Sequence, residues 1–118
     1  MVRDARETLS EHHENIEAFG KADSKRMQAF MAFVEASLEE GALDLKTKHL
    51  IILAISVHTR CEYCIVEHTQ EALKAGASRE ELIETAFLAG LMGGGPTVAC
   101  CASILRGAID TFAPDYGK

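Results

Sequence analysis

The chain has 118 residues, of which 47% are hydrophobic and 25% are charged, and its formal net charge at pH 7 is −6. This length predicts a single domain over residues 1–118, and this composition excludes an intrinsically disordered chain. The net negative charge, without a basic cluster, argues against nucleic-acid binding. The sequence also lacks a run of about 18 apolar residues, so no membrane span is predicted. Because the charged N-terminus lacks the apolar centre of a secretion signal, we expect a cytoplasmic protein with reduced thiols.

Turn signals are sparse, and the two prolines are Pro96 and Pro114. The chain therefore predicts an all-α fold, a compact bundle of about six helices. A first helix is expected over 4–19, ended near Gly20, and a second is capped by Asp23 or Ser24 and ended by Gly41. Its large apolar side chains follow helical spacing and indicate core or an oligomer interface: Met27, Phe30, Met31 and Phe33.

A third helix is predicted from an N-cap at Asp44 to about His58. Residues 50–57 are apolar on nearly all sides, which indicates a buried central helix. His49 shares a face with Leu53 and Ser56, so we expect it to point inward. His58 lies on the other side near the helix C-terminus, where the macrodipole explains a histidine, and His12 and His13 are expected on the solvated surface.

The next helix carries Cys61, Cys64 and His68, whose spacing of i, i+3 and i+7 places them on one helix face. A thiol near a helix N-terminus, beside a histidine and a cation such as Arg60, has a lowered pKa. Two thiols separated by two residues can close a disulfide, so one can attack an oxidant while the other resolves the product. This pattern favours redox chemistry.

Two other interpretations of the same three residues stay open. Cys61, Cys64 and His68 are competent zinc ligands, although a structural zinc site needs four ligands and no second CxxC pair follows. The two thiols are also compatible with a plain helix interior.

Gly76 ends this helix, and Ser78 with Glu81 forms a predicted capping box that opens a fifth helix. The run 93–96, Gly-Gly-Gly-Pro, interrupts the helical pattern, and a last helix is predicted over about 97–112. No Lys-Ser/Thr pair follows the glycines, so a phosphate-binding loop is not expected, and no motif indicates a nucleotide or lipid cofactor. Cys100 and Cys101 point about 100° apart on a helix and are interpreted as small buried hydrophobes.

Three stretches, 43–51, 59–68 and 72–78, resemble the carboxymuconolactone decarboxylase-like family, and specifically its alkylhydroperoxidase D-like branch with the CxxCxxxH motif. The resemblance covers about residues 25–110. It implies an all-helical protomer that assembles into a homotrimer or homohexamer, and it implies thiol peroxidase or disulfide-reductase activity.

The resemblance also implies roles for the motif residues. Cys64 is the expected peroxide-attacking thiol, Cys61 the resolving thiol, and His68 the residue that activates Cys64 through a proton relay. The pattern of this branch has a Glu at the position of His49, twelve residues before Cys61. A histidine can also accept a proton near neutral pH, so His49 is the expected replacement in the relay, with Lys48 and Glu62 as nearby alternatives.

The expected function is reduction of a hydroperoxide by the Cys61–Cys64 dithiol, which an external dithiol reductant protein then regenerates. One alternative is a carboxymuconolactone decarboxylase-type enzyme, although lactone decarboxylation needs no thiol pair and the chain shows no clear arginine cluster. The other alternative is a non-enzymatic helical oligomer that senses oxidants or binds a metal.

Overall fold

The computed structural model describes residues 3–118, which form helices joined by short turns and contain no strand. The helices are α1 (Ala5–Ala22), α2 (Ser24–Leu38), α3 (Leu45–Thr59), α4 (Glu62–Lys74) and α5 (Arg79–Gly93). A last helix continues without a break through α6 (Gly95–Cys100), a π-helical segment (Cys101–Leu105) and α7 (Arg106–Phe112), and a 3₁₀ turn, Ala113–Tyr116, follows. The all-α prediction with about six helices is confirmed. Over residues 3–118, none of these helices has the length and apolar character needed to cross a membrane.

Helix starts agree with the predicted caps. Asp23 accepts the backbone N–H of Arg26 at 3.1 Å, and Asp44 accepts that of Thr47 at 2.8 Å. Ser78 and Glu81 form the reciprocal capping box. Each cap satisfies backbone donors that the first turn of a helix leaves without a partner. Local sequence therefore determines where α2, α3 and α5 begin.

The predicted ends of the first two helices were wrong. α1 continues through Gly20 to Ala22, and α2 ends at Leu38, before Gly41 is reached. A Cβ atom at Gly20 would lie 2.9 Å from Cγ of Met27. Gly20 therefore allows α2 to approach α1 closely, which is a second physical use of glycine besides ending a helix.

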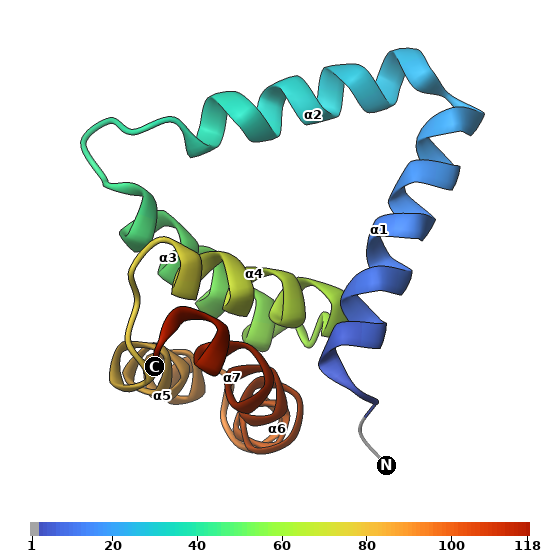
Figure 1. The fold of residues 1–118 in the computed structure, drawn as a ribbon. Coiled ribbons are helices and arrows are strands. Elements are labelled where there is room, and N and C mark those ends of the chain that lie inside the picture. The colour runs from blue at the N-terminus through green and yellow to red at the C-terminus, as the bar shows by residue number, and fades with distance from the viewer. Residues whose placement is uncertain (1–2) are drawn as a thin grey trace.

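The core lies between α3, α4, α5 and the last helix, and α1 adds its first two turns (Figure 1). His49, Leu53 and Ser56 are buried together on one face of α3, as predicted. The opposite face carries Ile51 and Ile55, and Ile55 is 58% exposed. The expectation that α3 is buried on nearly all sides was therefore wrong for the protomer: one face packs on the core and the other is free.

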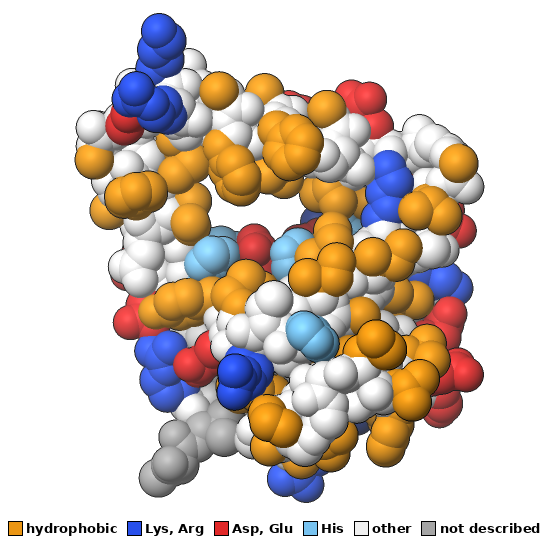
Figure 2. Space-filling view, turned by 180° about the vertical axis from the view of Figure 1, so that it is seen from behind, with side chains coloured by type: hydrophobic (Ala, Val, Ile, Leu, Met, Phe, Trp, Pro, Cys, Tyr) orange, Lys and Arg blue, Asp and Glu red, His pale blue; other side chains and the backbone are white. Residues whose placement is uncertain are grey.

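α1 and α2 extend away from the core and form two sides of an open triangle whose base is α3 and α4 (Figure 1). None of the α2 residues 24–38 is buried, and Phe30, Met31 and Phe33 are exposed. Hydrophobic side chains gather along α2, and histidines lie at the opposite rim of the opening (Figure 2). The apolar side of α2 is thus not part of the protomer core.

Candidate functional site

The turn between α3 and α4 brings the last turn of α3 beside the first turn of α4. The N–H of Arg60 donates to the carbonyl of Val57 at 3.2 Å, and the N–H of Cys61 donates to that of Ser56 at 3.1 Å. This is the hydrogen-bond pattern of a Schellman motif, which needs a left-handed residue. Arg60 supplies it with φ 58°, a conformation that costs a non-glycine residue about 1 kcal/mol or more.

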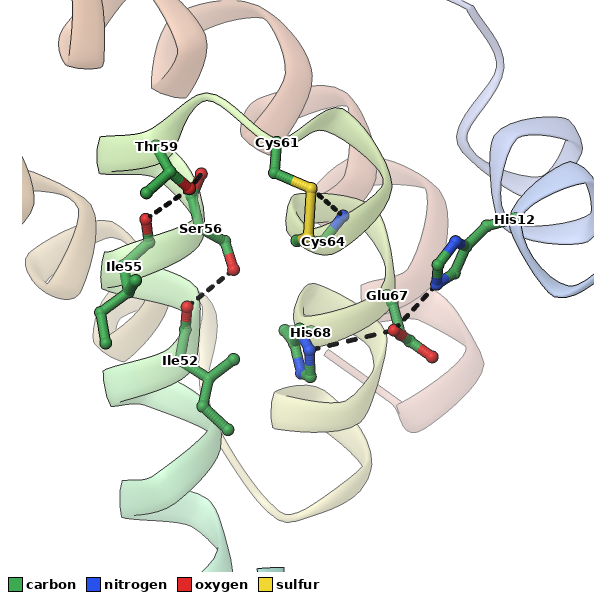
Figure 3. Close-up of a disulfide and its surroundings, with 9 residues drawn as sticks. All are labelled: His12, Ile52, Ile55, Ser56, Thr59, Cys61, Cys64, Glu67 and His68. Carbon is green, nitrogen blue, oxygen red and sulfur yellow. Dashed lines mark hydrogen bonds and ion pairs between the residues drawn. A yellow bond between two sulfur atoms is a disulfide. The ribbon is translucent and has the colours of Figure 1, made fainter. Parts of the chain in front are cut away.

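Cys61 and Cys64 form a disulfide, with their Cα atoms 5.2 Å apart (Figure 3). Cys61 is not inside the helix: it is the N-cap of α4, and its Sγ accepts the backbone N–H of Cys64 at 3.3 Å. The predicted stripe of three side chains on one helix face is therefore replaced by a capping cysteine above a first-turn cysteine. This position exposes Cys64 to the positive end of the helix dipole, which favours a thiolate.

Two histidines meet beside Cys64. His68 lies one turn further along α4 (Figure 3), and its Nδ1 lies 3.3 Å from Nδ1 of the buried His49 of α3. A hydrogen bond between these atoms requires a proton on one nitrogen and a lone pair on the other. Burial lowers the pKa of both histidines, and the carboxylates of Glu67 and Glu71 act in the opposite direction. The pair is thus held largely neutral near pH 7 and can accept a proton.

Sequence reasoning missed Glu67 and misplaced His12. The Nε2 of His12 lies 3.2 Å from Oε2 of Glu67, and the His12 side chain is only 15% exposed, whereas that of His13 is 59% exposed. The prediction of a solvated surface was right for His13 and wrong for His12. His12 lies one turn after the buried Leu9 on α1, and this spacing was the only local signal of its inward position.

The site opens into a hollow of about 740 Å³ between α1, α2 and the α3–α4 pair. Cys64, His49 and His68 line one side, and the hollow is visible in Figure 2 as the opening below α2. The facing wall is apolar and comes from α2: Met27, Phe30, Met31, Val34 and Leu38. The disulfide therefore lies next to a largely apolar space.

The other candidate residues have separate roles. Lys48 donates from Nζ to the carbonyl of Ser37 at 2.8 Å, and Glu62 forms an ion pair with Arg3 at 3.4 Å. Cys101 is half-buried in another groove, where burial raises the pKa of its thiol. The hollow is not lined by Lys48, Glu62 or Cys101.

A metal site has no preformed ligand set in the part of the chain that is described. Over residues 3–118, no group of three or more His, Cys, Asp or Glu side chains is arranged to hold a metal ion. The disulfide uses both sulfurs that the zinc alternative requires. Zinc binding would need a reduced pair and a rearranged His68.

Comparison with known proteins identifies relatives over most of the chain. The family model of the Carboxymuconolactone decarboxylase family matches residues 25–106. An uncharacterized protein of Cupriavidus necator is 35% identical over 96 residues, which are 81% of this chain and 85% of that protein.

Solved structures show the same fold. A carboxymuconolactone decarboxylase family protein from Legionella pneumophila is 36% identical and superposes with a TM-score of 0.86, covering 92% of this chain and 96% of its own. A family protein from Thermotoga maritima, with a suggested involvement in antioxidative response, is 28% identical with a TM-score of 0.73. The match covers 91% of this chain and 87% of that protein. The resemblance that the sequence indicated is thus confirmed at the level of family and fold.

The paired histidines, buried His49 and half-buried His68, predict how stability depends on pH. Both pKa values are lowered from their ordinary value of 6.5, so the unfolded chain binds more protons than the folded chain as the pH falls below about 6.5. The free energy of unfolding of the oxidised protein should therefore be constant from about pH 8 to 7 and fall towards pH 5.5.

Urea denaturation at fixed protein concentration measures this slope. The His49→Gln/His68→Gln double variant should lose part of this pH dependence of the free energy of unfolding. His58→Gln, which removes an exposed histidine, should keep it. A double variant with the full slope would contradict the assignment of the pH dependence to the buried pair.

Proposed function

This chain belongs to the carboxymuconolactone decarboxylase family, and on that premise we propose that it is a thiol-dependent peroxidase that reduces hydroperoxides through a Cys61–Cys64 dithiol/disulfide cycle. The observation that carries the proposal is the disulfide between an N-capping and a first-turn cysteine, beside the buried His49 and the half-buried His68. Cysteine pairs in this environment combine a stabilised thiolate with a resolving thiol.

The reaction proceeds in two steps in the reduced protein. The Cys64 thiolate attacks the outer oxygen of ROOH; the O–O bond breaks, ROH leaves after protonation, and Cys64 becomes a sulfenic acid. The Cys61 thiol then attacks the Cys64 sulfur, which forms the disulfide and releases water. An external dithiol protein R(SH)₂ returns two electrons and two protons and leaves as its own disulfide.

The histidines supply the proton transfers of this cycle. The hydrogen-bonded pair of His49 and His68 takes the Cys64 proton when the thiolate forms and returns a proton to the departing alkoxide. Because burial keeps the two rings largely neutral, one of them is available as a base near pH 7. His49 thus serves in place of the Glu that the family pattern implies at this position.

The hollow supports this function over the decarboxylase alternative. Its lining includes the acidic side chains Glu17, Glu67 and Glu71 and, among the described residues, neither Arg nor Lys. A carboxylate-bearing lactone would meet like charge there, whereas the apolar wall of α2 suits an organic hydroperoxide. The suggested antioxidative role of the Thermotoga maritima relative agrees with this choice.

We further propose that the chain functions as a homo-oligomer, a trimer or a hexamer. The protomer exposes large apolar side chains outside the hollow, mainly on α5 and on the free face of α3: Ile51, Ile55, Ile83, Phe87, Leu88, Leu91 and Met92. Monomers seldom expose so much apolar surface, and association would bury it.

The proposed cycle predicts different outcomes for variants of its two cysteines. Cys64→Ser should abolish peroxide turnover in the presence of a dithiol, because it removes the nucleophile. Without added dithiol, Cys61→Ser should consume about one peroxide per protomer and leave Cys64 as a sulfenic acid that mass spectrometry detects, whereas the wild type should form the disulfide.

Cys101→Ser is the control and should retain turnover. Full activity of Cys64→Ser would refute the peroxidase. Wild-type consumption that stops at one peroxide per protomer despite excess dithiol would identify an oxidant sensor instead.

The proposed proton transfer predicts that Cys64 oxidation depends on His49. His49→Gln preserves side-chain volume but removes the base, so the rate of Cys64 oxidation at pH 7 should fall about 100-fold, within the range of a lost acid–base group. Stopped-flow oxidation and the pH dependence of thiol alkylation measure this effect. An unchanged rate together with an unchanged thiol pKa would make His49 a packing residue.

The proposed assembly predicts the molecular mass of the protein in solution. Light scattering should give the mass of a trimer or hexamer, and Leu91→Lys should reduce it, because Leu91 is 79% exposed in the protomer and a charge there opposes apolar contact. Glu80→Lys, at an exposed polar position of the same helix, should leave the mass unchanged. A wild-type monomer would contradict the proposed assembly.

A further inference from the structure

The carboxylate of Glu67 is surrounded by imidazole rings from two helices. Its Oε2 lies 3.2 Å from Nε2 of His12 and 3.9 Å from Nε2 of His68. Its Oε1 lies 3.6 Å from Nε2 of His13. Figure 3 shows His12, Glu67 and His68 in a row that leads from α1 to the disulfide. The contacts with His12 and His13 do not follow from helix geometry alone, since α1 and α4 are far apart in the sequence.

His12 is itself held in place. Its ring stacks on that of Tyr63, with the centroids 5.2 Å apart and the planes 18° apart. The hydroxyl of Tyr63 donates to Oε2 of Glu11 at 3.0 Å, which fixes Tyr63 against α1. A part-buried and stacked histidine holds a carboxylate better than an exposed ion pair does, because less side-chain freedom is lost on contact.

The position of Glu67 has a direct effect on His68. A negative oxygen near Nε2 favours a proton on that nitrogen, so the neutral ring carries its lone pair on Nδ1, the nitrogen that faces His49. The charged groups around His68 are Glu67 and Glu71 of α4, which favour its protonated form, and His49 of α3 and His12 of α1, which oppose it together with burial.

We propose that Glu67, held by His12, is a positioning residue that orients the His68 ring and keeps a proton on its Nε2, so that the basic nitrogen faces His49. The role rests on the proposed thiol chemistry, in which the His49–His68 pair is the base for the Cys64 thiol. Neither Glu67 nor His12 touches the reacting sulfur in this role; both act through His68. α1 is thereby a functional part of the site as well as a wall of the hollow.

The test is the tautomer of His68 in the reduced protein, read from long-range proton–nitrogen correlations of its ring. Wild type should show the proton on Nε2. Glu67→Gln should lose this preference, and His12→Phe, which keeps a ring to stack on Tyr63 but removes its nitrogens, should weaken it. Glu14→Gln removes an exposed carboxylate of α1, two residues after His12, and should leave the tautomer unchanged.

A second readout is the rate at which iodoacetamide alkylates Cys64 at pH 7 in a Cys100→Ser/Cys101→Ser background. Glu67→Gln should lower this rate about 10- to 100-fold, the usual cost of removing a carboxylate that supports a functional histidine. Glu67→Asp, which keeps the charge on a shorter side chain, should give an intermediate rate. If Glu67→Gln fails to fold by circular dichroism, His12→Phe decides the question.

A proton on Nδ1 of His68 in wild type, or an unchanged tautomer and alkylation rate in Glu67→Gln, would overturn the proposal. Neither readout uses a peroxide. A protein with the expected tautomer change but without peroxide turnover would therefore refute the peroxidase and keep the positioning role. Turnover with no effect of Glu67→Gln on either readout would refute the positioning role alone.

Discussion

The left-handed turn at Arg60 is the constraint on which the site depends. It ends α3, satisfies two of its carbonyls and reverses the chain within two residues, so that α4 begins beside the end of α3. Cys61 thereby becomes an N-cap, Cys64 a first-turn residue, and His68 a neighbour of His49. The strain at Arg60, about 1 kcal/mol or more, is small beside the burial of Leu53, Val57 and Ile65 that the α3–α4 packing allows.

The same packing sets the chemistry of the two histidines by desolvation. A buried imidazole resists protonation, and two imidazoles that face each other resist double protonation still more. Carboxylates on α4 offset part of this effect, because Glu67 and Glu71 raise the pKa of His68 while burial lowers it. The balance leaves a base that is neutral in the resting site but can hold a proton once a thiolate forms beside it. Helix dipole and imidazolium then stabilise the same anion, which makes the reduced pair easier to form.

Sequence reasoning captured the features that local interactions decide and missed those that depend on distant partners. The caps at Asp23, Asp44 and Ser78 were predicted because the capping hydrogen bonds span three residues. The inward side of His49 followed from helical periodicity. The continuation of α1 through Gly20 was missed, because glycine ends a helix in one context and permits close packing in another. The left-handed Arg60 had no signal, since arginine has no preference for that conformation. The contact between His12 and Glu67 spans 55 residues, and only the spacing of His12 from Leu9 hinted at it.

The open frame of α1 and α2 has a physical consequence for a thiol site. A cysteine that reacts with a peroxide and afterwards with a reductant must be reached by both, yet its histidines must stay out of bulk water for burial to control their protonation. The hollow satisfies both needs, because Cys64 and His68 line a space that small molecules can enter, while His49 lies buried behind them. α2 contributes an apolar wall to the hollow without contributing to the protomer core. The polar side of the hollow is thus fixed by the packing of α1, α3 and α4, whereas the apolar side on α2 is not constrained by the protomer core.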